Sequence, residues 1–324
     1  MSEIKKLGEQ GIIDLFKSDD LVSNRIVKSI GDDCAALRQP DGNLLLWTTD
    51  MLAEGVHFDR GFGSPYDLGC KSLAVNLSDI AAMGGEPEAC LLCLSLPRTL
   101  PEEWVREFRD GFTAISEKYG CPVIGGDTCG SDSSIVISVT VMGFVPESQA
   151  LWRDGAKEGD DIWISATPGV SALGMKILLG KSDASSPAGE AAVKHHLRPE
   201  PRLALGRELA EEHLVTACID TSDGIAVDLG HICEASGLGA RIFEDRIPLP
   251  EIPADRDDDP LLLALHGGED YDLLFTARPN NRTELEATGG LFRLGEMVAI
   301  DEDIQLLRTD GRSETLIPAG FSHF

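Results

Sequence analysis

The chain has 324 residues, and its 55 Asp and Glu residues outnumber its 28 Lys and Arg residues, for a formal net charge of −27. Such a charge disfavours nucleic acid and anionic membranes as partners, and an acidic protein that handles phosphates needs metal ions between the like charges. No apolar run approaches the roughly 18 residues of a membrane span, and MSEIKKLGEQG has no signal-peptide core, so we expect no membrane association and a cytoplasmic protein.

The first half of the chain alternates between strand and helix patterns. Residues 43–50, NLLLWTTD, predict a strand that delivers Thr48, Thr49 and Asp50 at its end. Residues 66–83 have helical spacing, with Asn76 and Asp79 one turn apart. Further along, the patterns predict a buried strand at 88–97, a helix at 101–120 and a long strand at 133–145.

The second half follows a polar, turn-rich stretch at 146–159, where we place a domain boundary. We expect an N-terminal ATP- and Mg-binding domain at 1–148 and a C-terminal domain at 149–324 that completes the site. Beyond the boundary the patterns predict strands at 161–167, 214–219, 239–243, 271–277 and 290–296, and helices near 170–180, 188–197, 202–212 and 222–235. The mixture indicates an α/β or α+β fold in both halves.

Two familiar patterns carry little weight. GMKILLGKS resembles a P-loop, but five residues separate Gly174 from Gly180 where that loop has four, and the segment ends a helix instead of opening one. Gly180 is better explained as a helix C-cap. Cys90 and Cys93 form a C-x-x-C without a second pair at zinc spacing, so we expect reduced thiols.

The acidic motifs are more informative. Carboxylates recur beside glycines, at strand ends and at helix starts, at Asp32, Asp33, Asp50, Asp79, Asp127, Asp220 and Asp223. Such positions are where α/β proteins gather ligand groups, and Mg²⁺ prefers oxygen ligands while keeping waters and phosphates in its shell. Taken singly, each is also explained as a solvated loop residue, and Ser222 as a helix N-cap.

The chain carries a series of motifs in a fixed order: GDDCAAL, TTDMLAEGVHF, KSLAVNLSDIAAMGG, IGGDT, HLRPEPR, IDTSDGIAVDLGHI and GGEDYDLLF. This series resembles the thiamine-monophosphate kinase family, of the superfamily that includes aminoimidazole ribonucleotide synthetase and selenophosphate synthetase. The resemblance implies a two-domain α/β fold whose N-terminal domain forms a β-barrel with its twin in a homodimer. It also implies direct in-line transfer of the ATP γ-phosphoryl group to thiamine monophosphate at a site with several Mg²⁺ ions and no general base.

The resemblance also assigns roles to individual residues. The implied Mg²⁺ ligands are Asp33, Thr48, Thr49, Asp50, Asp79, Asp127, Asp220 and Asp223. The implied ATP contacts are Gly126, Asp127, Arg153 and Ser222. The implied contacts with thiamine monophosphate are His57, Glu269 and Phe321, the last by alignment of the C-terminal GFSHF.

Two alternatives remain open. One is another ATP-dependent enzyme of the same superfamily, similar to selenophosphate synthetase or aminoimidazole ribonucleotide synthetase; the former would be favoured by a long, Gly-rich, cysteine-bearing N-terminal tail, which is not seen here. The other is a non-enzymatic, acidic divalent-ion-binding protein, which would need a calcium loop of the D-x-[DN]-x-[DN]-G type, and no such loop is present.

Overall fold

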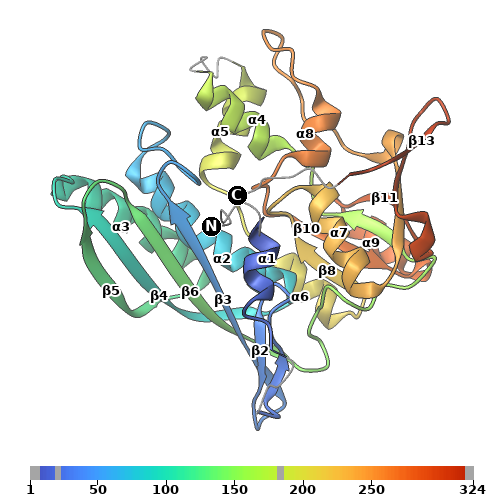
Figure 1. The fold of residues 1–324 in the computed structure, drawn as a ribbon, viewed down its shortest axis with the longest axis horizontal. Helices are drawn as coiled ribbons and strands as arrows, with labels where there is room; N and C mark the ends of the chain where they lie inside the picture. The colour runs from blue at the N-terminus through green and yellow to red at the C-terminus, as the bar shows by residue number, and fades with distance from the viewer. Residues whose placement is uncertain (1–7, 19–22, 181–185, 318–324) are drawn as a thin grey trace, which may run out of the picture.

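The structure is a computed structural model that describes residues 8–18, 23–180 and 186–317. Two mixed sheets stand side by side, each with helices packed against it (Figure 1). The predicted mixed α/β fold is therefore confirmed. The predicted boundary at 148/149 falls between the last strand of one sheet and the first strand of the other, and as a boundary it stays a prediction.

The first sheet has six strands in the order β1-β2-β3-β6-β4-β5. Its strands are β1 (Ile26–Lys28), β2 (Ala35–Arg38), β3 (Asn43–Ala53), β4 (Glu86–Pro97), β5 (Val123–Ser131) and β6 (Val136–Pro146). Only β4 and β5 pair in parallel. Burial alternates along β3 and β6, because one face of the sheet packs on helices and the other does not.

Helices α2 (Pro65–Ala82) and α3 (Glu102–Tyr119) cover the packed face of this sheet. Helix α2 begins with a capping box formed by Ser64 and Asp67, and nearly all of its residues are buried. It crosses α3 so closely that a Cβ at Gly111 would overlap the carbonyl oxygen of Tyr66. Its other side contacts the second sheet, so α2 lies between the two halves of the molecule (Figure 1).

The second sheet has seven strands in the order β13-β12-β9-β11-β7-β10-β8. Its strands are β7 (Asp161–Ile164), β8 (Ala217–Asp220), β9 (Gly239–Phe243), β10 (Leu273–Ala277), β11 (Phe292–Val298), β12 (Ile304–Leu307) and β13 (Ser313–Thr315). The associated α-helices are α4 (Val170–Leu179), α5 (Pro187–Leu197), α6 (Leu203–Glu211), α7 (Ile225–Ser236), α8 (Pro260–His266) and α9 (Arg282–Thr288). A core of aliphatic residues joins α7 to the sheet.

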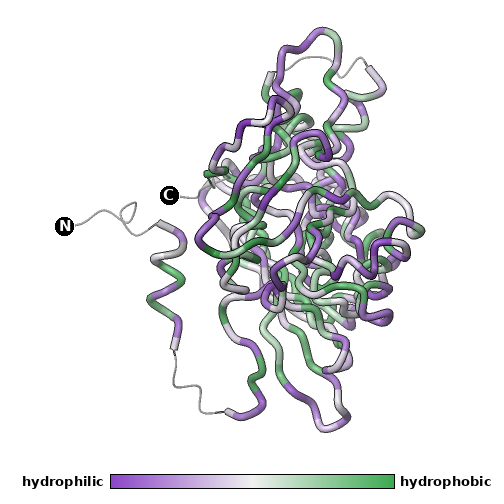
Figure 2. Tube along the Cα trace, turned by 90° about the vertical axis from the view of Figure 1, so that its right-hand side faces the viewer, coloured by the Kyte–Doolittle hydropathy of each residue, from purple (hydrophilic) through white to green (hydrophobic). Residues whose placement is uncertain are grey.

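A short helix, α1 (Gly8–Asp14), lies at the outside of the molecule (Figure 2). In the described part of the chain no helix has both the length and the apolar character that crossing a bilayer requires.

Most predicted elements are present with shifted ends. Helix α4 ends at Gly180 as expected, which removes the P-loop resemblance. The predicted helix start at Ser222 was wrong: α7 begins at Ile225, after Gly224, and Ser222 does not cap it. The segment IGGDT, in which Asp127 follows two glycines, is part of strand β5, where Gly125 and Gly126 pair with β4.

Candidate active site

Three carboxylates from distant parts of the chain meet between the two sheets. Asp33 comes from the turn before β2, Asp79 from α2 and Asp220 from the end of β8, and one oxygen of each lies within 4.8 Å of the others. Asp220 is 3% exposed, and the Asp33 side chain is 1% exposed. A group of buried acids at this separation is costly unless a cation or protons compensate the charge.

Neighbouring polar groups fix the orientation of these acids. The Thr48 hydroxyl donates a hydrogen bond to Asp79 Oδ2, and the Ser78 hydroxyl donates to Asp220 Oδ2 over 2.7 Å. Asn76, one turn before Asp79 on α2, accepts the main-chain N–H of Asp50 over 2.9 Å. Strand β3 and helix α2 thereby hold Asp50 next to the cluster.

Burial and mutual repulsion change the acidity of the cluster. Burial raises the pKa of Asp33 to about 8, although the Arg153 guanidinium opposes the shift. Burial, followed by the charges of Asp50, Asp220 and Asp33, raises the pKa of Asp79 well above its ordinary value. Burial likewise raises the pKa values of Asp50 and Asp220, each to about 6. Carboxylates whose pKa values are raised together are typical of functional sites.

The cluster fits a hard divalent cation. Asp33 Oδ2 is buried and has no hydrogen-bond partner among the described residues, so it is available as a ligand. The surrounding donors are carboxylate and hydroxyl oxygens, the set that Mg²⁺ prefers. The Arg153 Nε donates to the other oxygen, Oδ1, over 3.1 Å. Arg153, which the sequence placed in a turn-rich segment, is thus directed at the cluster.

Two cavities open beside the cluster and share Ser222 and Asp223 in their walls. The first has a volume of about 520 Å³ and is also lined by Asp50, His57 and Glu269. The second, of about 750 Å³, is lined by Arg153 and by residues of α1 and α7. The segment from β8 to α7 therefore forms a wall between two spaces, each large enough for a small ligand.

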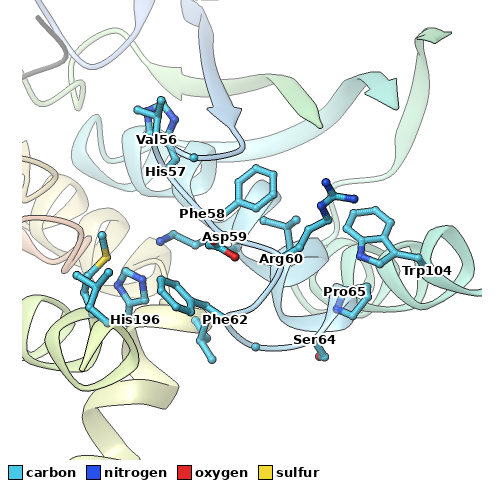
Figure 3. Close-up of a pocket in the computed structure, with 17 residues that line it drawn as sticks. Val56, His57, Phe58, Asp59, Arg60, Phe62, Ser64, Pro65, Trp104 and His196 are labelled. Carbon is cyan, nitrogen blue, oxygen red and sulfur yellow. The ribbon is translucent and has the colours of Figure 1, made fainter. Parts of the chain in front are cut away.

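A smaller cavity of about 170 Å³ adjoins the first and shares Val56, His57 and Met175 with it. Its walls carry aromatic rings from different elements: Phe58 and Phe62 follow β3, while Trp104 belongs to α3 (Figure 3). His57, at the junction, accepts the main-chain N–H of Ala53 at its Nδ1 over 3.0 Å. Flat aromatic walls suit a ring-bearing ligand.

Some predicted site residues lie away from the cluster in this chain. Gly126 is one of them, because it lies three strands away from Asp50 across the first sheet. The path runs from Asp50 to its partner Val139, then to Leu92 and then to Gly126, which makes about 14 Å at the usual strand spacing. Asp127 pairs with Cys93, which lies through β6 in register with the exposed Met51 of β3, so the carboxylate lies on the sheet face opposite α2.

The hydroxyl of Thr49 also lies on that open face. It donates a hydrogen bond to the Val139 carbonyl oxygen over 3.0 Å and lies 3.0 Å from the Thr140 hydroxyl. Thr49 can therefore approach the cluster only through its main chain. Phe321 lies outside the described residues.

The sequence reasoning missed three buried polar residues near the cavities. Lys71 is paired with Glu269, Tyr271 lines the first cavity, and Asp228 accepts the main-chain N–H of Gly224 at the start of α7. Lys71 could have been found from spacing, since it lies eight residues before Asp79 on α2 and Val75 lies midway between them.

Comparison with known proteins identifies the family. Residues 31–145 match the AIR synthase related protein, N-terminal domain, and residues 157–302 match the AIR synthase related protein, C-terminal domain. The chain is 41% identical over 304 residues to the thiamine-monophosphate kinase of Escherichia coli (strain K12), covering 91% of both chains. It is 36% identical to that of Aquifex aeolicus (strain VF5), covering 99% of both.

Among solved structures, AaThiL complexed with AMPPCP and TMP superposes with a TM-score of 0.88 at 33% identity, over 100% of this chain and 99% of that one. Two family models that together span most of the chain, and relatives of this identity and coverage, point to one assignment. The chain belongs to the AIR synthase related proteins and, within them, to the thiamine-monophosphate kinase family.

Proposed function

We propose that this enzyme transfers the γ-phosphoryl group of ATP directly to the phosphate of thiamine monophosphate at a site that holds several Mg²⁺ ions. The bond from the γ-phosphorus to the bridging oxygen breaks, ADP leaves, and an oxygen of the acceptor phosphate forms the new bond of thiamine diphosphate. The carboxylate cluster between two ligand-sized cavities carries this proposal. The AMPPCP and TMP bound to the related AaThiL support it.

In this proposal Asp33, Asp50, Asp79, Asp220 and Asp223 hold the metal ions. Bound Mg²⁺ would supply neutralisation of the phosphate charges. The chain's own contribution is to keep the carboxylate oxygens in place. The side chains that do so are the hydroxyls of Thr48 and Ser78 and the amide of Asn76.

The remaining polar groups orient the substrates. Arg153 and Ser222, in the wall of the second cavity, contact ATP, whereas His57 and Glu269, in the wall of the first, contact the acceptor. No side chain is needed as a base, because a phosphate monoester has its second pKa near 6 and is already anionic at neutral pH.

The reaction is tested by incubating the purified protein with ATP, Mg²⁺ and either thiamine monophosphate or thiamine, and identifying the products by mass. We expect thiamine diphosphate from the monophosphate and far slower reaction with thiamine, whose hydroxyl must lose a proton. Equal turnover of both acceptors would refute the assignment. With ATP made chiral at the γ-phosphorus, in-line transfer inverts the configuration, and retention would indicate a phosphorylated enzyme.

We also propose that two chains pair through the first sheet to form a barrel. Every residue of the edge strand β5 from Val123 to Gly130 is exposed, including Ile124 at 60%. The cross-strand pair Trp47 and Met142 lies on the sheet face turned away from α2, and Met51, on the same face, is 59% exposed. An open apolar face ending in an unpaired edge is what a partner sheet would cover.

The pairing also explains the position of Asp127. Because Asp127 faces away from its own cluster, it can act as a metal ligand and ATP contact, with Gly126, only toward the site of a second copy. Coexpression of Asp50→Asn and Asp127→Asn chains tests this. Each variant alone should be nearly inactive, and random mixed dimers should regain about a quarter of wild-type activity, since half the dimers hold one intact site. No recovery in a purified mixed dimer would place Asp127 outside a shared site.

A further inference from the structure

A largely buried ion pair joins the two halves of the molecule where two cavities meet. These are the first cavity, of about 520 Å³, and the smaller cavity of about 170 Å³ with aromatic walls, called the aromatic cavity below. Lys71 Nζ lies 2.7 Å from Glu269 Oε1, and the two side chains are 4% and 23% exposed. Lys71 lines the aromatic cavity and Glu269 lines the larger one. The pair therefore lies between these two spaces, and Lys71 is about 12 Å from Asp79 along the axis of α2.

The main chain holds Glu269 in an unusual conformation. Its φ is 65°, in the left-handed region that few residues other than glycine adopt. The Glu269 N–H donates to the Ser222 carbonyl oxygen over 2.8 Å, and a Cβ on the preceding Gly268 would collide with that same oxygen. Such backbone strain persists where the surroundings fix it and is concentrated at functional sites. Glu269 is thus fixed at one end to the segment between β8 and α7 and at the other to α2.

Charged and titratable groups from several elements face the Glu269 carboxylate. Besides Lys71 on α2, they are His196 on α5, with Nδ1 3.6 Å from Oε2, His57 after β3, and the Tyr271 hydroxyl. Burial alone would raise the pKa of Glu269, but Lys71, with smaller contributions from His196 and His57, outweighs burial and leaves that pKa below its usual value. Burial and Lys71 lower the pKa of His196 to about 4, so Lys71 is the main cation at this position.

We propose that Lys71 is a positioning residue for the acceptor: its ammonium holds the Glu269 carboxylate at the junction of the two cavities, where it receives the cationic, amino-bearing ring portion of the substrate. The inference rests on the proposed function. Thiamine monophosphate carries a fixed positive charge on one ring and an amino group on the other, and a carboxylate attracts both. The rings of Phe58, Phe62 and Trp104 line the adjoining cavity and favour a flat cation.

The test compares Lys71→Met and Lys71→Arg with wild type, measuring kcat and the KM for each substrate between pH 6 and 9, with melting temperatures alongside. We expect Lys71→Met to raise the KM for thiamine monophosphate about tenfold at pH 8, the value of one hydrogen bond between charged groups, with kcat and the KM for ATP changed less than about threefold. Lys71→Arg should restore most of the affinity. Lys118→Met is the matched control, because that lysine is 49% exposed and pairs with Glu200 at the surface.

The pH dependence separates positioning from a structural role. The phosphate of the substrate, with its second pKa near 6, titrates in every variant between pH 8 and 6. Without the ammonium, burial also raises the pKa of Glu269, so in Lys71→Met the acceptor KM should rise more steeply than in the wild type as the pH falls from 8 to 6, and the difference between the two profiles is the pH dependence that comes from Glu269. The double variant Lys71→Met, Glu269→Gln has no unpaired buried charge and should behave like Glu269→Gln alone, without that pH dependence. If Lys71→Met is too unstable to assay, the acceptor KM of this double variant is compared with that of Glu269→Gln. Equal values support the positioning role of Lys71, and a clearly higher KM in the double variant contradicts it.

Two results would overturn the inference. One is an unchanged acceptor KM in Lys71→Met, and the other is a parallel loss of kcat, ATP affinity and melting temperature in every Lys71 variant. Either could occur with a wild-type enzyme that fully phosphorylates thiamine monophosphate, and the proposed function would then stand. Failure of the wild-type enzyme to make thiamine diphosphate would instead reject the proposed function itself.

Discussion

His57 offers a sharp test of whether transfer uses a protein base. Its Nδ1 accepts the Ala53 N–H over 3.0 Å, so the neutral ring carries its proton on Nε2. In that form Nε2 can donate a hydrogen bond to an acceptor oxygen but cannot remove a proton from it. His57→Asn retains an oxygen that can accept the Ala53 N–H and loses the Nε2 donor.

The expected magnitude follows from the loss of one hydrogen bond to a charged group, about 1.5–3 kcal/mol, or roughly 10- to 100-fold in affinity. We therefore expect His57→Asn to raise the KM for thiamine monophosphate by that factor, while single-turnover transfer at saturating substrate keeps most of its rate and the same acid limb. His57→Gln, whose amide can donate near the Nε2 position, should lose less. His213→Asn, at an exposed site, is the control.

A loss of about a thousandfold in the saturated transfer step would contradict this reasoning, because that is the usual effect of removing a general base. Measuring single turnover is essential, since KM alone mixes binding with later steps.

Other predictions concern the metal site. Asp79→Asn should lower kcat by at least about 100-fold with an unchanged circular dichroism spectrum, because it removes a charged ligand and keeps the shape; the exposed Asp132→Asn should be silent, and equal damage from both would invalidate the mapping. Mg²⁺ at 100 times its Kd should add about 2.7 kcal/mol to the free energy of unfolding of the wild type, and should therefore raise its melting temperature. The same Mg²⁺ concentration should have far less effect on the melting temperature of Asp220→Asn. An equal Mg²⁺ effect on both proteins would place the ion elsewhere.

The sequence predicts the long elements of this fold well, but it does not predict the shortest strands or the directions of the side chains at the site. Helix α2 and strand β6 could be predicted because their apolar periods are long and regular. The short strands β1, β12 and β13 could not, since three or four residues give too little pattern and pairing decides their state.

The side-chain directions at the site needed the structure. Thr48 and Thr49 look equivalent in the sequence, yet the pleat of β3 turns one to Asp79 and the other to the open face. Asp127 could be recognised from its motif but not located, because its distance from Asp50 depends on the strand order. The ion pair of Lys71 with Glu269 joins residues far apart in the chain, which no local pattern reveals.

The adjacent acids Asp32 and Asp33 are alike in the sequence, and their hydrogen bonds distinguish them. Asp32 Oδ1 accepts the Asp33 N–H over 3.1 Å and Oδ2 pairs with Lys28 over 3.0 Å, so both of its oxygens are engaged. Arg153 takes only Oδ1 of Asp33 and leaves Oδ2 buried without a partner among the described residues. Asp33 can therefore keep its arginine and still offer one oxygen to a cation, whereas Asp32 would first have to give up a bond.

We accordingly expect Asp33→Asn to raise the Mg²⁺ concentration needed for half-maximal activity by at least tenfold, about 1.4 kcal/mol. Asp32→Asn should change that concentration little and should instead lower the melting temperature, because it weakens the buried contact with Lys28. Measuring both quantities for both variants separates metal binding from stability. If Asp32→Asn weakened the Mg²⁺ response as much as Asp33→Asn, the free oxygen of Asp33 would not be what selects the ligand, and the metal would have to displace Lys28 from Asp32.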